Sequence, residues 1–200
     1  MWKRIAEAMR GVGDGELRRL VRSLYDLSPE NRAFLATWCG DEASGDALRE
    51  KYKAKITAQF FVNGRPRMTG GLDLAACRKM LNEYRRVTKT PEIPGGDGAG
   101  DVRGFVDLGL HYIEVGTRYS VELCWDEARG YNSMGAVAEE MVRVLGEVRE
   151  GPELADEFLP RARALAAAGS GIGYGFGDDL DWLAREFERL VGGKDAEAPE

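Results

Sequence analysis

Apolar residues recur three and four positions apart along almost the whole chain, which is the spacing of one face of an α-helix. In the most regular stretch they are Phe105, Leu108, Tyr112, Val115 and Tyr119. Stripes of the same kind run through further segments, at 17–25, 29–38, 48–60, 74–84, 131–148, 152–168 and 180–190. A chain patterned in this way buries its apolar side chains by packing helices against one another.

A half-buried β-strand needs apolar residues at every second position, and residues 57–62 alone have some β character. Even there, Tyr52, Ile56 and Phe60 keep the four-residue spacing of a helix. We therefore predict an all-α fold with no significant sheet. Its expected architecture is an irregular array of about seven to eight antiparallel helices, arranged as a stack of helix pairs or as a bundle.

Three segments interrupt the helical pattern. Residues 63–71 form a Gly/Pro/Arg loop, and residues 90–101 have the Gly/Pro composition of a linker. Residues 192–200 are a polar tail that cannot bury apolar surface. We predict a single helical domain over 1–191, or alternatively two lobes hinged at 90–101, followed by a disordered tail at 192–200.

The composition, 44% hydrophobic and 31% charged, is typical of a globular chain with a full core. No apolar run approaches the roughly 20 residues of a membrane span, and residues 1–10 lack the apolar run of a secretory signal. Cys39, Cys77 and Cys124 are isolated, which argues against a disulfide framework or a zinc site. We expect a cytoplasmic protein with no membrane contact, in which each cysteine is a small buried residue.

The charges divide unevenly along the chain. Residues 1–90 hold 18 Lys/Arg against 11 Asp/Glu, a net charge of +7, whereas residues 91–200 hold 10 against 23, a net charge of −13. The basic excess concentrates in residues 49–90, with 11 basic and 3 acidic side chains. Such an uneven charge distribution carries information about binding partners rather than about the fold, and it also permits head-to-tail self-association.

The helix predicted at 73–89 carries a basic face beside its apolar stripe. At 100° per residue, five cations fall on one arc, and the acidic Glu83 lies outside it. Such a face is a candidate for binding phosphates or an acidic partner. The alternatives are a solvated surface and pairing with the chain's own acidic second part. We name this set the basic face; its members are Arg78, Lys79, Arg85, Arg86 and Lys89.

On the preceding helix, Arg49 and Lys53 flank one edge of the apolar stripe, and Lys51 and Lys55 flank the other. That arrangement suits long stems that cover the core while their charges reach water. We therefore assign this helix no binding role.

The single histidine lies on a charged helix face. His111 and Glu114 belong to a series that steps by three and four residues, together with Asp107, Arg118 and Glu122. One hypothesis is an acid–base pair or a helix-borne metal site. The other is a ladder of opposite charges around Arg118, and one histidine without a second is a poor basis for a metal site.

Glycines alternate with other residues at 171–177, just before Asp178 and Asp179. A phosphate-binding loop would need a preceding strand and a following lysine, and neither is present. The two carboxylates suit the start of a helix and would repel a phosphate. We predict a tight turn that places Tyr174 and Phe176 against neighbouring helices.

Several short motifs together resemble an uncharacterised bacterial family of small helical proteins, a domain of unknown function. The resemblance runs from about Leu17 to Leu190, and it implies no activity, cofactor or partner. The motifs that carry it are Leu24–Leu35, Lys51–Lys53, Leu74–Lys79, Glu83–Arg85, Glu114–Arg118, Tyr131–Met134 and Ser170–Asp179.

Packed helices, uneven charge and few catalytic motifs favour a non-catalytic interaction or scaffold module whose partner is a protein or another acidic macromolecule. One alternative is a nucleic-acid-binding protein that uses the basic face. A second is an enzyme centred on His111 and Glu114. No cofactor, metal or catalytic residue is assigned.

Overall fold

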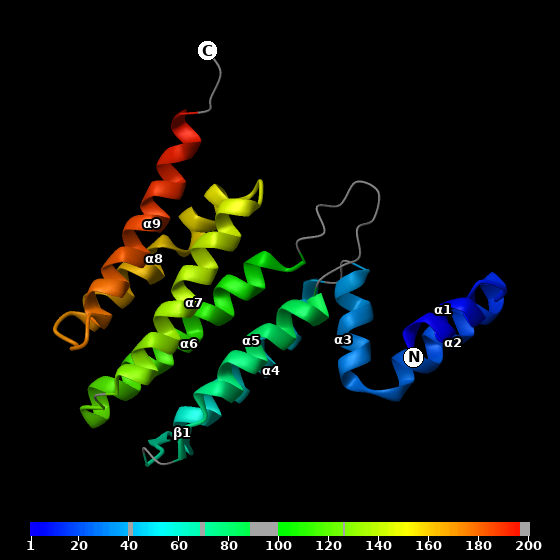
Figure 1. Cartoon of the computed structure of the whole chain (residues 1–200), viewed down its shortest axis with the longest axis horizontal. Helices are drawn as coiled ribbons and strands as arrows, with labels where there is room; N and C mark the ends of the chain where they lie inside the picture. Colours follow the sequence, from blue (N-terminus) through cyan, green and yellow to red (C-terminus); the bar gives the residue numbers. More distant parts are fainter. Residues whose placement is uncertain (40–41, 69–70, 89–99, 126, 197–200) are drawn as a thin grey trace. The chain divides into compact units, whose positions relative to one another are not determined.

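The computed structural model describes residues 1–39, 42–68, 71–88, 100–125 and 127–196 (Figure 1). The chain divides into two compact units, Met1–Gly45 and Asp46–Glu200. The Gly/Pro-rich segment 90–101 therefore falls inside the second unit, and most of it lies outside the described residues.

The all-α prediction is confirmed: the described residues form nine helices and one short hairpin. The segments predicted from apolar spacing are all helical, and a further N-terminal helix, α1, precedes them. Within these ranges, no helix combines the length and apolarity needed to cross a bilayer. The elements are α1 Trp2–Met9, α2 Asp14–Leu27, α3 Pro29–Trp38, α4 Glu42–Phe60, β1 Phe61–Val62, β2 Arg65–Pro66, α5 Leu74–Thr88, α6 Val102–Leu123, α7 Ala128–Glu147, α8 Gly151–Gly169 and α9 Phe176–Ala196.

The first unit contains α1, α2 and α3. Ser28 caps α3, because its hydroxyl oxygen accepts a hydrogen bond from the backbone N–H of Asn31 over 3.1 Å. The predicted apolar stripe of α2 is present, yet the helix has no buried residue. Its stripe side chains are between 38% and 43% exposed: Leu17, Leu20, Val21, Leu24 and Tyr25.

In the second unit, the chain leaves α4 through a tight hairpin that the sequence prediction treated as loop. Phe61 pairs with Pro66 and Val62 with Arg65. Asn63 and Gly64 both have positive φ, at 51° and 75°, as a two-residue type I′ turn requires. The Asn-Gly pair is the sequence signal for this turn.

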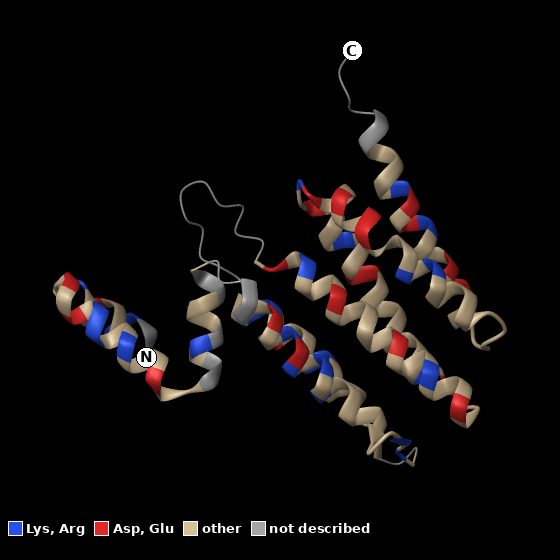
Figure 2. Ribbon diagram, turned by 180° about the vertical axis from the view of Figure 1, so that it is seen from behind, with Lys and Arg blue, Asp and Glu red and all other residues tan. Residues whose placement is uncertain are grey.

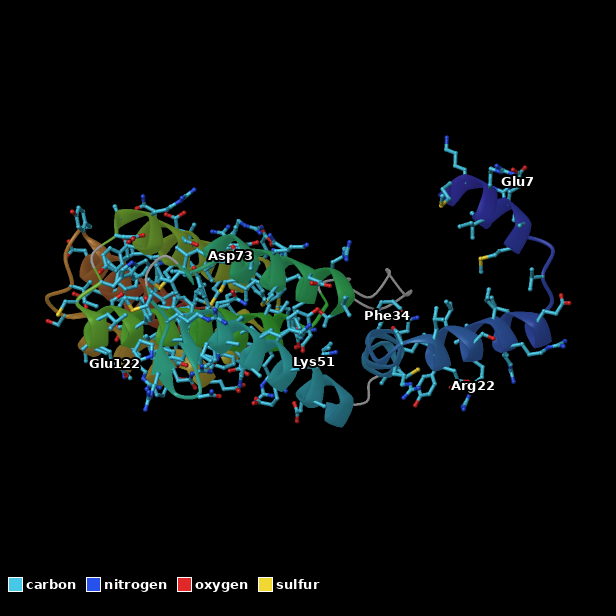
Figure 3. The ribbon with its side chains drawn as sticks, turned by 90° about the horizontal axis from the view of Figure 1, so that it is seen from below. Glu7, Arg22, Phe34, Lys51, Asp73 and Glu122 are labelled. Carbon is cyan, nitrogen blue, oxygen red and sulfur yellow. The ribbon has the colours of Figure 1, made fainter. Side chains whose placement is uncertain are left out.

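Helix α6 is central to the second unit, and its side chains are buried against several neighbours. Against α7 it runs antiparallel, because Gly116 approaches Met134 while Gly109 approaches Met141. A side chain at either glycine would collide with the methionine, so glycine permits this close packing. Figure 3 shows the side chains crowded between the helices of this unit.

Helices α4 and α8 both run parallel to α6, as their ion pairs show. On α4, Arg49 pairs with Asp101 and Lys53 with Asp107. On α8, Glu157 pairs with Arg103 and Arg161 with Asp107. Helices α4 and α8 therefore both border the charged face of α6.

Three local expectations differ from the structure. Cys77 is buried as expected, but Cys39 and Cys124 are exposed free thiols; Cys124 ends α6 in the left-handed region, at a φ of 48°. Phe176 is buried and stacks on Tyr131 of α7, as expected; Tyr174 also contacts the Tyr131 ring, yet it stays 67% exposed. Helix α9 continues to Ala196, into the segment predicted as tail, and residues 197–200 lie outside the description.

Candidate functional site

The basic face of α5 divides into two parts. Arg85 pairs with Glu140 on α7, and its guanidinium carbon lies 4.8 Å from the centre of the Phe105 ring. Arg78 donates to the backbone oxygen of Ser133 over 3.3 Å. Lys79 and Arg86 are exposed, and Lys89 lies outside the described residues.

Arg85 thus pairs with the chain's own acidic second part, which is one of the alternatives given above for the basic face. Figure 2 shows Lys and Arg interspersed with Asp and Glu along α4 and α6. An anion-binding role for the basic face stays a prediction, and among its described members Lys79 and Arg86 are the exposed cations.

The charged face of α6 does not join His111 to Glu114. The Nε2 atom of His111 lies 2.9 Å from the Thr57 hydroxyl and 3.2 Å from the backbone oxygen of Lys53, both on α4. Glu114 instead accepts two hydrogen bonds from Arg161 on α8, over 2.8 and 2.9 Å. The two residues proposed as an acid–base pair therefore bond to opposite neighbours of α6.

Arg118 does pair with Glu122 one turn later on α6, over 2.6 Å, as the ladder hypothesis expects. Glu114, however, belongs to a network that extends beyond the helix.

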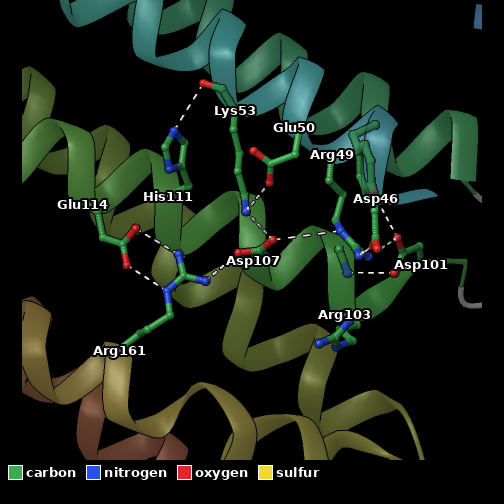
Figure 4. A network of polar contacts seen from close by, with 12 residues as sticks. Asp46, Arg49, Glu50, Lys53, Asp101, Arg103, Asp107, His111, Glu114 and Arg161 are labelled. Atoms are coloured by element: carbon green, nitrogen blue, oxygen red, sulfur yellow. Dashed lines mark hydrogen bonds and ion pairs between the residues drawn. The ribbon is translucent and has the colours of Figure 1, made fainter. Parts of the chain in front are cut away.

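That network bridges α4, α6 and α8 (Figure 4). Asp107 lies at its centre, 2.8 Å from the ammonium nitrogen of Lys53 and 2.5 Å from a guanidinium nitrogen of Arg161. Beside them, Arg49 donates to Asp101 over 3.3 Å. Opposite charges on three helices thus meet over the polar face of α6.

Burial and pairing act on these groups in opposite directions. Burial raises the pKa of the Asp107 carboxyl, but hydrogen bonds from Lys53 and Arg161 outweigh it, so the pKa falls below its ordinary value. Burial lowers the pKa of His111, and the nearby charge of Glu114 opposes this only in part. At neutral pH His111 is therefore uncharged, and Asp107 is ionised.

Two cavities flank this network along α6. The first, the polar cleft, has a volume of about 520 Å³, and Asp46, Arg49, Arg103 and Glu157 are among the residues that line it. Within it, Arg103 makes a bidentate pair with Glu157, donating from Nε to Oε2 and from a terminal nitrogen to Oε1, so the cations and carboxylates neutralise one another. Its balance of charge does not favour a phosphate over a cation.

The second cavity, the α6/α8 groove, has a volume of about 620 Å³ and is mainly apolar. Arg161 separates it from the polar cleft, because this side chain lines both. The hydroxyl of Thr117 on its wall is buried and has no hydrogen-bond partner among the described residues. The groove is lined by Glu114, Thr117, Arg118, Val121, Glu122, Arg161, Ala164, Leu165 and Ala168.

Exposed apolar side chains gather at one end of the second unit. This end, the hairpin end, combines the β1–β2 hairpin, the α6–α7 turn and the α8–α9 turn, at the lower left of Figure 1. Ring contacts connect the three turns: Tyr119 contacts Phe61 and Trp125, and Tyr131 contacts Trp125 and Tyr174. The exposed large apolar residues described in the second unit are Val62, Met68, Val121, Leu123 and Tyr174, here called the hairpin-end patch.

Sequence reasoning missed much of the network. It assigned Arg49 and Lys53 to covering the core, whereas their charges end in ion pairs and their side chains are only 13% and 21% exposed. Their four-residue spacing matches that of Asp107 and His111, a signal that the two helix faces oppose each other. Arg161 carries no comparable signal, because its partners come from a helix about 50 residues away.

No family model, no curated protein and no solved structure matches this chain. The resemblance to an uncharacterised bacterial family therefore stays a prediction, and function is inferred from the chain's own geometry.

Proposed function

We propose that the protein is a non-catalytic helical module of the cytoplasm that binds another protein. The observation that carries this proposal is the hairpin-end patch. Met68 is 84% exposed and Tyr174 is 67% exposed. Clustered exposed apolar side chains, rather than scattered ones, are typical of interaction surfaces.

The aromatic side chains beneath the patch support it. Tyr119, Trp125 and Tyr131 are nearly fully buried and contact one another edge to face or tilted, with ring centres 5.5 and 5.8 Å apart. The hydroxyl of Tyr131 donates to the backbone oxygen of Trp125. A surface held on packed rings loses little conformational freedom when a partner binds.

The partners of the charged residues also favour binding over catalysis. His111, Glu114 and Asp107 are each held by a neighbouring helix, so their hydrogen-bonding capacity is directed to the fold. The free thiols Cys39, Cys77 and Cys124 support a reducing compartment.

The test begins with affinity purification of the full chain from cells, followed by identification of the protein that co-purifies. The purified partner is then titrated calorimetrically against the wild type, against Met68→Ser/Tyr174→Ser and against Asp156→Ser. We expect the patch variant to bind at least about tenfold more weakly, because exposed anchors at an interface contribute strongly. Equal affinity for the wild type and the patch variant would reject the patch as the binding surface; Asp156→Ser, an exposed position outside the patch and the basic face, serves as the surface control.

A further inference from the structure

The α6/α8 groove is formed by two parallel helices, each of which presents residues one turn apart. On α6 these are Thr117 and Val121, and on α8 they are Ala164 and Ala168. The alanines leave the volume of the groove open, and Val121 is 58% exposed at its edge. Rows spaced by four residues are the ridges between which another helix packs.

The fold contains its own example of a helix packed against this pair. Helix α7 contacts both α6 and α8, and it presents Met134 and Met141 to glycines of α6. The groove residues of α6, by contrast, include Glu114, Arg118 and Glu122, which lie on the charged face that borders α4 and α8. A helix seated there would pack against α6 and α8 as α7 does, on a different face of α6.

The charges around the groove restrict what such a helix can carry. At the inner end, Arg161 is held by Glu114 and Asp107, so it has little capacity for a ligand. At the outer rim, the Arg118 side chain is 59% exposed, its guanidinium lies 4.4 Å from the centre of the Phe61 ring, and it binds Glu122 through Nε. Its two terminal nitrogens have no hydrogen-bond partner among the described residues. In the lining, Glu114 and Glu122 balance Arg161 and Arg118, so the groove complements an apolar face. The terminal nitrogens of Arg118 are the donors that a carboxylate at the edge of such a face would meet.

The geometry points to one occupant: an amphipathic α-helix of a partner protein. Its apolar side chains, one turn apart, fill the space over Ala164 and Ala168, and an acidic side chain beside them pairs with Arg118. This inference rests on the proposed interaction function and names the partner's chemistry. Val121 belongs to both the groove and the hairpin-end patch, so the two surfaces are continuous.

The test uses a displayed library of helix-favouring peptides of about 16 residues, long enough to form helix on binding. Peptides are selected on the full-length protein, then synthesised and titrated by fluorescence anisotropy. The groove variant is Ala168→Trp, which fills the cavity. The matched control is Ala167→Trp, because Ala167 is exposed on the same helix but does not line the groove.

We expect selected peptides to carry apolar residues at i, i+3 or i+4 and i+7 with a neighbouring Asp or Glu. Ala168→Trp should weaken their binding at least about tenfold, and Ala167→Trp should leave it within about twofold. Arg118→Glu should weaken binding as well, and a peptide with Lys in place of its acidic residue should restore it. Circular dichroism checks folding, and Ala164→Leu replaces Ala168→Trp if the latter unfolds.

Failure to enrich any peptide, selection of sequences without helical spacing, or equal binding to Ala168→Trp and Ala167→Trp would each overturn the groove assignment. The Met68→Ser/Tyr174→Ser protein separates this from the proposed function. If that variant loses the cellular partner while Ala168→Trp retains it, the interaction function stands and the groove proposal fails.

Discussion

The buried hydroxyl of Tyr84 donates a hydrogen bond to the carboxylate of Asp101 over 2.5 Å, and the same carboxylate caps helix α6. One Asp101 oxygen accepts the backbone N–H of Gly104 over 2.7 Å, and the other also receives Arg49 from α4. Asp101 thus connects α4, α5 and α6 through one side chain. Since Tyr84 is fully buried and its other polar neighbour, Arg49, can only donate, its hydroxyl proton depends on this carboxylate for an acceptor.

Replacing Asp101 should therefore destabilise the protein more than the loss of a helix cap alone would. We expect Asp101→Ala to lower the free energy of unfolding by about 2–4 kcal/mol, because a cap contributes about 1 kcal/mol and an orphaned buried hydroxyl costs about 1–3 kcal/mol. Asp73→Ala, which removes only the exposed cap of α5, should cost about 1 kcal/mol. Urea denaturation measures both; equal losses would mean that the Tyr84 contact contributes nothing.

Two glycines, Gly116 on α6 and Gly146 on α7, predict changes in stability of opposite sign. Gly116→Ala places a methyl group against the sulfur of Met134, so we expect destabilisation of about 1–3 kcal/mol. Gly146→Ala on α7 meets no atom within 4 Å and removes a flexible residue from a helix. It should stabilise by about 0.4–1 kcal/mol. Thermal and urea unfolding of the two variants test the pair, and a stable Gly116→Ala protein would contradict the tight α6–α7 contact.

His111 gives the stability a pH dependence of known sign. Burial holds its pKa below the ordinary value of 6.5, so the folded state binds the proton less readily than the unfolded chain. The contribution to stability is complete above about pH 6.5 and is lost as the pH falls from there toward the folded pKa.

The wild type should consequently lose more unfolding free energy between about pH 7.5 and about pH 5.5 than His111→Gln does, by no more than about 1.4 kcal/mol per pH unit. Because the chain has one histidine, the difference isolates this side chain. Urea titrations at both pH values measure it, and parallel pH profiles would show that His111 is not buried in solution.

The division of the basic face limits any nucleic-acid affinity. With Lys79 and Arg86 exposed, and at most Lys89 in addition, duplex binding should show a slope of log K against log salt between about −1.8 and −2.7. Lys79→Glu/Arg86→Glu should abolish it. A salt series with a labelled duplex measures the slope, and a steeper value would mean that Arg78 and Arg85 leave their present partners.

The helices could be predicted from the sequence because apolar spacing is a local property: Leu74, Cys77, Leu81 and Tyr84 form one stripe of α5 whatever they pack against. Which cations of α5 are exposed follows from the same positions around the helix axis. Arg78 and Arg85 lie within about 40° of Leu74, at the border of the apolar arc, and they reach α7. Lys79 and Arg86 lie about 120–140° away, so they stay exposed.

The network and the groove could not be predicted in the same way, because they depend on which helices become neighbours. Asp107 meets Lys53 and Arg161 across about 54 residues in either direction, and no local spacing encodes such pairing. The groove likewise exists only because Ala164 and Ala168 of α8 come to lie beside Val121 of α6.

The exposed apolar stripe of α2 has a consequence for local unfolding of the chain. A helix of 14 residues without a buried side chain is close to the length at which isolated helices are marginal in water. Its amide protons should exchange with solvent through local fraying, whereas those of α6 should exchange only when the whole second unit unfolds. Within one polypeptide, amide hydrogen exchange should therefore be fast in α2 and slow in α6.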